Sequence, residues 1–241
     1  MHSHPRELSV IRHGQSAGNV ANDAALASGS HQLDLAERDM DVALSDLGAV
    51  QASALSKWFV ANECPDIVFS SPYVRAYETA RIGLVGAGFD VPIVCDERLR
   101  EREFGILDRL TKPGIIVRHP EQAAARAFLG KMYHRPPGGE SWVDVAARIR
   151  SFYRDLRLDH PGANVVVVTH QAVILLFRYV LEALTEDQVM EIDSENDIAN
   201  AAVTTYRGDG DTHPLLAVFN DSSHIPAEVT TVRPDVPVAP R

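Results

Sequence analysis

Cysteine is scarce in this sequence, with only Cys64 and Cys95 among 241 residues. Neither residue belongs to a CxxC pair or to a cluster of Cys and His, so nothing indicates a cysteine-based metal site. Both lie in or beside apolar segments, and we expect buried free thiols in a reducing compartment. HExxH, Walker A and GxGxxG motifs are lacking too, so no metal or cofactor is predicted.

Long apolar runs are missing as well. The N-terminal stretch MHSHPREL has no charged region followed by an apolar run, and no segment near 18 residues is apolar throughout. These absences predict neither a signal peptide nor a membrane partner. A cytoplasmic location is the expectation.

Basic residues are in the minority, since 23 Lys and Arg against 33 Asp and Glu give a net charge of −10. An acidic chain gains little from nucleic-acid phosphates at long range, and no basic stripe with interleaved aromatic residues supports an RNA-binding module. If the substrate is an anion, its positive charge must be local. Each group of arginines is therefore informative.

What the chain does have is an alternation of strand and helix patterns. Short β-branched apolar runs predict strands at 7–13, 66–71, 91–97, 163–170, 201–207 and 214–220. Helical spacing of apolar residues predicts helices at 45–62, from Ser71-Pro72 onward, at 141–158 and at 172–184. The alternation predicts an α/β fold, a three-layer sandwich with a mostly parallel central sheet flanked by helices.

The domain organisation is predicted to be simple. Residues 1–224 form a single α/β domain, in which residues 20–43 are a long loop with some helix. Residues 103–140, rich in Gly and Pro, are a lid-like insertion with partial helix. Residues 225–241 are Pro-rich and poor in apolar side chains, so we expect a flexible, unpacked tail.

Three predicted strands end in residues suited to chemistry. VIRHGQSAGN carries Arg12 and His13, SSPYVRAYETA carries Arg75, and VVVVTH ends in His170. If these strands are parallel neighbours, the two arginines and two histidines converge at their carboxyl ends. Each residue alone would be read as structural or solvated, and only the joint pattern favours an anion site.

Phosphate is the natural ligand of such a site. A guanidinium matches phosphoryl oxygens with two parallel hydrogen bonds, and a helix N-terminus nearby adds its positive dipole end. A histidine ring nitrogen can attack phosphorus, provided that its other nitrogen is held by an acceptor. The leaving alkoxide needs a proton, and LREREFG offers Glu101 and Glu103 as acids.

Five motifs in order resemble one known family. RHGQSAGN, SSPYVRAYETA, LREREFG, PPGGESW and VVVVTHQAV, followed by FNDSSHI, look like the histidine phosphatase superfamily in its phosphoglycerate-mutase-like branch. The resemblance covers about residues 7–221.

The resemblance implies a role for each motif residue. His13 is the nucleophile that becomes phosphorylated, Arg12, Arg75 and His170 bind the phosphoryl oxygens, and Glu101 is the proton donor, with Glu103 ranked below it. No metal and no cofactor are implied. The remaining candidate substrate contacts are Asn19, Gln15, Ser16, Gln171 and Lys112.

A mutase and a phosphatase would share the phosphohistidine step. Lys112 falls where the mutases carry a substrate lysine, but Ala17 stands in place of their aromatic residue. Their arginine pair has no clear counterpart, because the cations of the insertion are scattered, namely Arg118, Arg126, Lys131 and Arg135.

The fructose-2,6-bisphosphatase domain is a second comparison. YHRPPGGES and THQAVILLF are similar to its stretches and Lys131 matches a substrate lysine, but Leu175 stands where that domain has an arginine. We expect a metal-independent phosphatase for a small phosphorylated substrate, with a mutase as the alternative and a catalytically silent phospho-ligand-binding protein third. Homo-oligomerisation through strand edges or helix faces stays open.

Overall fold

A single six-stranded sheet runs through the middle of the molecule. The computed structural model describes residues 3–209 and 211–232. The sheet has the order β3-β2-β4-β1-β5-β6. Its strands are β1 (Glu7–Arg12), β2 (Ile67–Ser70), β3 (Ile93–Cys95), β4 (Asn164–Thr169), β5 (Val203–Arg207) and β6 (Leu215–Asp221). The first four strands are parallel, and β5 and β6 are antiparallel, so the mostly parallel sheet is confirmed.

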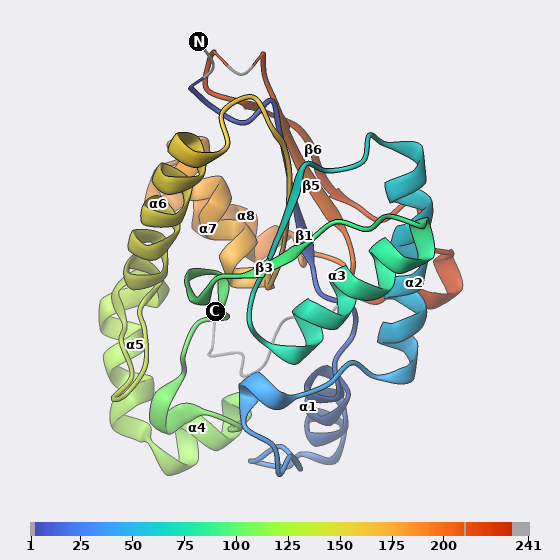
Figure 1. Cartoon of the computed structure of the whole chain (residues 1–241). Coiled ribbons are helices and arrows are strands. Elements are labelled where there is room, and N and C mark those ends of the chain that lie inside the picture. The colour runs from blue at the N-terminus through green and yellow to red at the C-terminus, as the bar shows by residue number, and fades with distance from the viewer. Residues whose placement is uncertain (1–2, 210, 233–241) are drawn as a thin grey trace.

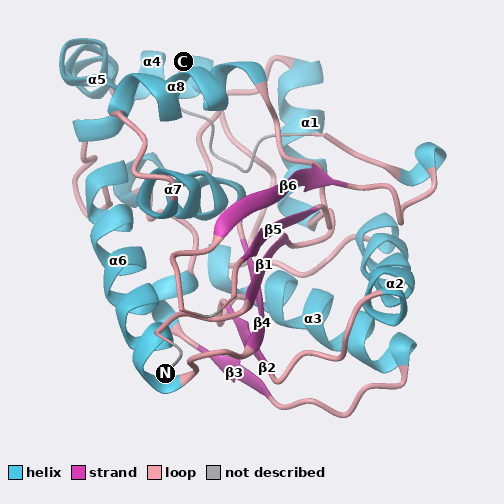
Figure 2. Cartoon of the chain, turned by 90° about the horizontal axis from the view of Figure 1, so that it is seen from above, coloured by secondary structure: helices cyan, strands magenta, loops and turns pink. Residues whose placement is uncertain are grey.

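Helices cover both faces of the sheet, as the alternation predicted. Their bounds are α1 (Ala17–Ser28), α2 (Asp46–Ala61), α3 (Val74–Ala87), α4 (Lys112–Arg118), α5 (Pro120–Tyr133), α6 (Trp142–Asp159), α7 (Gln171–Leu181) and α8 (Glu186–Glu195). Figure 2 shows α2 and α3 on one side of the sheet and α6 and α7 on the other. The three-layer sandwich is confirmed.

Side chains along the central strands point alternately to the two faces of the sheet, so the core is divided between the two helical layers. Leu8 and Val10 of β1 pack with α6 and α7, whereas Ile11 packs with α2 and α3. The valines of β4 alternate in the same way, and all six residues of that strand are buried. The continuous apolar run of β4 therefore reflects burial on both faces.

Some helix boundaries differ from the prediction. The third helix begins at Val74 with Tyr73 as its N-cap, not at Ser71-Pro72. Part of the predicted loop at 20–43 is the end of α1, whose start is stabilised by a capping box of Ser16 and Asn19. The helix α8 was missed because its sequence, EDQVMEIDSE, has few apolar residues.

The segment after Ile225 is packed, which corrects the expectation of a flexible tail for residues 225–232. Ile225 is only 5% exposed and joins the core beneath α2 and α3. The side-chain amide of Gln51 donates to the Val229 carbonyl at 2.7 Å and to Thr231 Oγ1 at 2.8 Å. A single isoleucine and a few backbone groups suffice to dock this stretch, so composition alone was a poor guide. Residues 233–241 of the predicted tail lie outside the described residues.

The two cysteines are free thiols, but the prediction that they are buried is wrong. Both are exposed. Cys64 lies just beyond the end of α2, and Cys95 ends β3, an edge strand of the sheet. An apolar neighbourhood in sequence does not bury a residue at an edge. Within the described ranges, no helix combines the length and apolar character that a bilayer crossing needs.

The predicted insertion lies at the carboxyl end of the parallel strands. In Figure 1, α1, α4 and α5 gather at the end of the sheet opposite the N-terminus. A kink at Gly130, whose φ is 75°, interrupts α5 near its end. The reactive ends of β1, β2 and β4 therefore face these helices, which positions the site.

Candidate active site

His13 follows β1 directly and its backbone is held on both sides. Its N–H donates to the Thr169 carbonyl at 2.9 Å, and its own carbonyl accepts from Ala201 N and from the Asn200 side chain, both at 3.2 Å. The residue is fully buried. Strand pairing of β1 with β4 thus continues one residue further and fixes the imidazole at the sheet end.

The His13 ring has one nitrogen committed to the backbone. Nδ1 lies 2.6 Å from the Gly14 carbonyl oxygen. A carbonyl can only accept, so Nδ1 carries the proton and the lone pair of the neutral ring is on Nε2. The sequence predicts this tautomer, because a nucleophilic histidine needs its other ring nitrogen held by an acceptor.

The two glycines Gly14 and Gly48 explain how the loop after β1 can lie against α2. A Cβ on Gly14 would be 2.5 Å from the Gly48 carbonyl oxygen, and a Cβ on Gly48 would be 1.9 Å from the Gln15 carbonyl oxygen. Neither distance is sterically possible. The glycine of the RHG motif therefore serves close backbone packing.

His170 lies beside His13. The two ring centroids are 5.1 Å apart with an interplanar angle of 62°. Nε2 of His170 is hydrogen-bonded to Ser71 Oγ at 2.8 Å, and Ser71 N donates to the Val168 carbonyl at 2.9 Å. The sequence had marked Ser71 only as a helix start. Its position at the end of β2, beside β4, makes it the partner of His170.

Two arginines are buried at the same end of the sheet. Arg12, the last residue of β1, is fully buried and donates through Nη1 to the Ile198 carbonyl. Arg75, at the start of α3, donates through Nη1 to the Asp39 carbonyl oxygen at 2.6 Å and forms an ion pair with the Asp39 carboxylate at 3.1 Å. Asp39 was missed, because it is one of several acidic residues in an irregular segment.

Tyr73 joins Arg75 to the histidines. The guanidinium carbon of Arg75 lies 5.0 Å from the Tyr73 ring centroid, and that centroid is 5.2 Å from the ring of His170. The structure therefore brings Arg75, His170 and His13 into one continuous group, as predicted from the strand ends. Tyr73 itself was not among the predicted site residues.

The proton-donor candidate Glu101 is nearly inaccessible, at 1% exposure. Its Oε1 accepts from Arg102 N at 2.7 Å. The backbone two residues before it is tied to β4, because Thr169 Oγ1 donates to the Leu99 carbonyl at 2.7 Å. Glu103 is exposed instead, and its Oε1 accepts from the Tyr73 hydroxyl at 2.9 Å.

The remaining predicted contacts lie around this group with mixed roles. Ser16 and Asn19 bond to each other in the α1 capping box, and Gln15 Oε1 accepts from Ser45 Oγ at 2.7 Å. Gln171 begins α7, directly after His170, and its amide donates to Asp197 at 3.4 Å. Lys112 is an exposed first residue of α4. Their contact with a substrate stays a prediction.

Three buried or half-buried cations lie close enough together for their charges to interact, and one of them, Arg102, also interacts with Glu101. We name Arg102, Arg126 and Lys131 the cationic cluster; Arg102 and Arg126 are 3% and 5% exposed. Lys131 pairs with Asp193 at 2.5 Å and lies 4.5 Å from the Trp142 ring centroid. The reading of the insertion cations as scattered is thus wrong for two of them.

The other two insertion cations, Arg118 and Arg135, do lie apart on the surface. Arg118 donates to Gln32, and Arg135 pairs with Asp144. The grouping of Arg126 and Lys131 needed the packing of α5 against α6 and α8. No spacing rule could have found it.

Burial lowers the pKa values of all three side chains of the cationic cluster. It lowers the pKa of Arg126 to about 10, and burial together with the neighbouring Arg126 lowers the pKa of Arg102 to about 10. Burial also lowers the pKa of Lys131, against the attraction of Asp193. The two arginines stay protonated at neutral pH, so buried positive charge lies near Glu101, the candidate proton donor.

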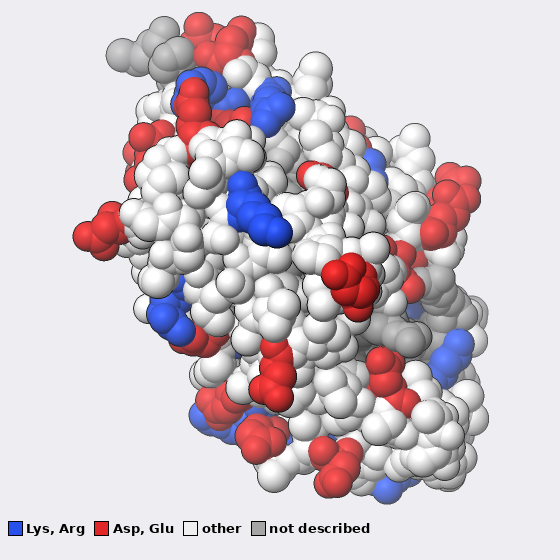
Figure 3. All heavy atoms as spheres, turned by 90° about the vertical axis from the view of Figure 1, so that its right-hand side faces the viewer, with Lys and Arg blue, Asp and Glu red and all other residues white. Residues whose placement is uncertain are grey.

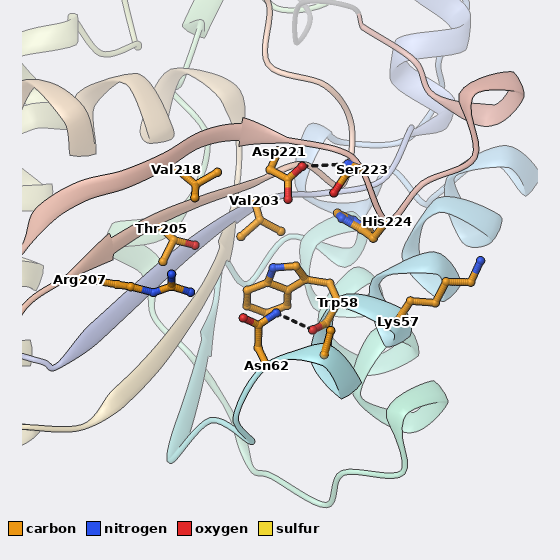
Figure 4. A pocket seen from close by; sticks show the side chains of 11 residues that line it. Lys57, Trp58, Asn62, Val203, Thr205, Arg207, Val218, Asp221, Ser223 and His224 are labelled. Atoms are coloured by element: carbon orange, nitrogen blue, oxygen red, sulfur yellow. Dashed lines mark hydrogen bonds between the residues drawn. The ribbon is translucent and has the colours of Figure 1, made fainter.

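Away from the candidate site, a hollow of about 410 Å³ lies between α2 and the strands β5 and β6. Figure 4 shows Trp58, Arg207 and His224 around it. None of its lining residues belongs to the histidine and arginine group. The face made by α2 and α3 carries Lys and Arg singly among Asp and Glu (Figure 3). Neither surface adds to the candidate site.

The described part of the chain contains no group of three or more His, Cys, Asp or Glu side chains arranged to hold a metal ion. At the carboxyl ends of the strands, Arg12 and Arg75 supply positive charge that could meet a phosphoryl group, and the two histidines lie beside them. Such an arrangement can bind a phosphoryl group, attack it through Nε2 of His13 and supply a proton from a buried carboxylic acid.

Comparisons with known proteins agree with this geometry. Residues 8–221 match the family model of the histidine phosphatase superfamily (branch 1). The chain is 32% identical to a 2,3-bisphosphoglycerate-dependent phosphoglycerate mutase of Methylobacterium radiotolerans, covering 86% of this chain and 92% of the mutase. It is 34% identical to a 6-phosphofructo-2-kinase/fructose-2,6-bisphosphatase of Caenorhabditis elegans, covering 72% of this chain and 34% of that protein.

A solved structure is similar over almost the whole length. The mycobacterial glucosyl-3-phosphoglycerate phosphatase in complex with inorganic phosphate superposes with a TM-score of 0.69 and 29% identity. The match covers 92% of this chain and 100% of that one. Both phosphatases and mutases are therefore among its relatives.

Proposed function

Because the chain belongs to branch 1 of the histidine phosphatase superfamily and is an enzyme of that family, we propose that it is a metal-independent phosphatase acting on a small phosphomonoester. The observation that carries the proposal is the pair of buried imidazoles, His13 and His170, 5.1 Å apart, with Nδ1 of His13 committed to a backbone carbonyl. In this proposal Nε2 of His13 is the nucleophile and His170 binds the phosphoryl oxygens, roles that the lone pair on Nε2 and the neighbouring imidazole support.

In the first step, Nε2 of His13 attacks phosphorus in line with the leaving oxygen. The N–P bond forms while the P–O bond to the leaving group breaks. Arg12, Arg75 and His170 stabilise the charge on the three equatorial oxygens. Glu101 gives its proton to the leaving alkoxide, so that a neutral alcohol departs.

In the second step, water attacks the phosphohistidine from the side that the alcohol has left. Glu101, now a carboxylate, takes the proton of that water as the P–N bond breaks. Inorganic phosphate forms and His13 regains its neutral state. The same residue thus serves as acid and then as base.

The positive charge of the cationic cluster favours one class of substrate. The Arg102 guanidinium lies close enough to Glu101 for their charges to interact, and we place the leaving group of the proposed substrate near this cluster. Two buried guanidinium groups stabilise an anion there more than a neutral alcohol, since little water screens them. The proposed substrate is therefore a phosphomonoester whose remaining part carries a second negative charge.

The experiment is hydrolysis of para-nitrophenyl phosphate with EDTA present, comparing wild type with His13→Ala. Turnover that survives EDTA and falls by roughly 10³-fold or more in the variant supports the proposal. Trapping of a phosphorylated protein in wild type and not in the variant would identify the intermediate. A substantial rate in His13→Ala would overturn the nucleophile assignment.

A mutase is the second candidate, because the Methylobacterium relative carries that name. The two activities differ only in the acceptor of the phosphoryl group. Transfer to phosphoglycerate faster than hydrolysis would reverse the order of the candidates. Binding of phosphate with neither activity would indicate a catalytically silent protein.

A further inference from the structure

Tyr73 lies within the candidate site, although the sequence did not mark it as a site residue. It is the N-cap residue of α3 and only 4% exposed. Its ring lies against the imidazole of His170, with centroids 5.2 Å apart, and against the Arg75 guanidinium, 5.0 Å from the centroid. The ring therefore contacts two groups that bind phosphoryl oxygens.

The hydroxyl of Tyr73 reaches in the other direction, to the segment that carries the proton donor. It donates to Glu103 Oε1 at 2.9 Å. Burial and the negative charges of Asp39 and Glu103 raise the pKa of Tyr73. The phenol thus stays protonated, and can donate, throughout the neutral range.

The Glu101 segment is held from several sides, among them by Arg148, whose Nη2 donates to the Glu101 carbonyl at 3.3 Å. At one end, Thr169 Oγ1 donates to the Leu99 carbonyl at 2.7 Å. At the other end, the backbone of Glu103 pairs with Glu140 through bonds of 2.9 and 3.1 Å. The bond from Tyr73 links this second end directly to the phosphoryl-binding group.

We propose that Tyr73 is a positioning residue, which holds the Glu101 segment against the phosphoryl site by tying Glu103 to the ring contacts with His170 and Arg75. The role rests on the proposed function, because it concerns delivery of a proton to a leaving group. Tyr73 does not touch the reacting atoms. It sets the distance between the group that binds the phosphoryl oxygens and the acid.

The test compares two phosphomonoesters whose leaving groups differ in basicity. β-Glycerophosphate needs a proton on its leaving alkoxide, whereas para-nitrophenyl phosphate hardly does. Tyr73→Phe keeps the ring and removes the hydrogen bond to Glu103, and Glu103→Ala removes the acceptor of that bond. Each should lower kcat on β-glycerophosphate roughly tenfold more than kcat on para-nitrophenyl phosphate.

The double variant decides whether the two residues act together. If one bond carries the effect, Tyr73→Phe combined with Glu103→Ala is no slower than the worse single variant. Tyr153→Phe is the matched control, since its buried hydroxyl bonds to His4 at 3.1 Å, near the N-terminus. It should leave the ratio of the two rates unchanged.

Two outcomes would overturn the role of Tyr73. The first is an unchanged ratio of the two rates in Tyr73→Phe, whether or not both rates fall; the second is that the effects of the two substitutions multiply. Glu103 is exposed, so its variant tests the tie even if Tyr73→Phe folds poorly. A wild type that turns over neither substrate would instead refute the proposed function, and the positioning role with it.

Discussion

Two adjoining regions of this molecule hold their positive charge in different ways. In the first region, at the carboxyl ends of β1, β2 and β4, the reactive side chains follow strands whose hydrogen bonds continue into the site, as in His13 N to the Thr169 carbonyl. In the second, residues 99–140, no strand fixes the cations. Arg102 is held by the Glu140 carbonyl and Lys131 by Asp193.

The difference separates chemistry from substrate choice. The carboxyl ends of the central strands position the side chains that follow them through backbone hydrogen bonds. The candidate phosphoryl site therefore depends little on which side chains pack around it. The second region positions its cations through side-chain packing of α5 against α6 and α8, which can change without disturbing the sheet. We infer that the first region performs the common reaction and that the second selects its substrate.

The largest expected effect concerns the first region. Arg75→Met removes a proposed donor to the phosphoryl oxygens and leaves the partly exposed Asp39 carboxylate without its cation. We expect kcat/KM to fall by roughly 10²–10³-fold on every phosphomonoester, because the lost charge acts on the transition state. Steady-state kinetics with Arg81→Met, an exposed arginine of the same helix, provide the control. A loss confined to one substrate would contradict the division of roles.

Glu101→Gln probes the boundary between the two regions. The rate on β-glycerophosphate should fall by about 10²-fold and the rate on para-nitrophenyl phosphate by much less, because only the alkoxide needs protonation. The ratio of the two kcat values is the measurement. Equal slowing on both substrates would assign the acid elsewhere, first to Glu103.

Arg126→Met tests the second region alone. KM for 3-phosphoglycerate, which carries a carboxylate, should rise roughly tenfold, the scale of one hydrogen bond to a charged group. Hydrolysis of para-nitrophenyl phosphate should change little, since its leaving group carries no second charge. Arg118→Met, at the exposed end of α4, is the matched control. An equal change on both substrates would contradict the separate roles of the two regions.

The smallest effect is a dependence of stability on pH. Burial, with the cations Arg126 and Arg102 nearby, lowers the pKa of His134 below its ordinary value of 6.5. Below pH 6.5 the unfolded chain therefore binds a proton that the folded state resists, so the free energy of unfolding falls as the pH falls. Between pH 7 and 5, Tm should decrease less in His134→Asn than in wild type or in His119→Asn. An identical decrease would show that the cluster has no such influence.

Much of the first region could be predicted because its signals are local. RHG, the RAYETA stretch and the VVVVTH strand each place an arginine or a histidine within a few positions of a strand end, and parallel pairing brings those ends together. Ser71 and Tyr73 stood inside a quoted motif. Their contacts with His170 depend on the lateral order of β2 and β4, which no motif states.

The sequence by itself determined the α/β alternation, the buried central strand and the four residues that are proposed to bind or attack the phosphoryl group. These follow from periodicity and from chemistry carried at fixed positions along the chain. Only the tertiary structure decided that Arg126 and Lys131 meet Arg102, that Asp39 pairs with Arg75, and that residues 225–232 dock on α2. Each of those contacts joins segments more than 20 residues apart through side chains. Their proximity depends on how whole helices and loops pack, which no local pattern encodes.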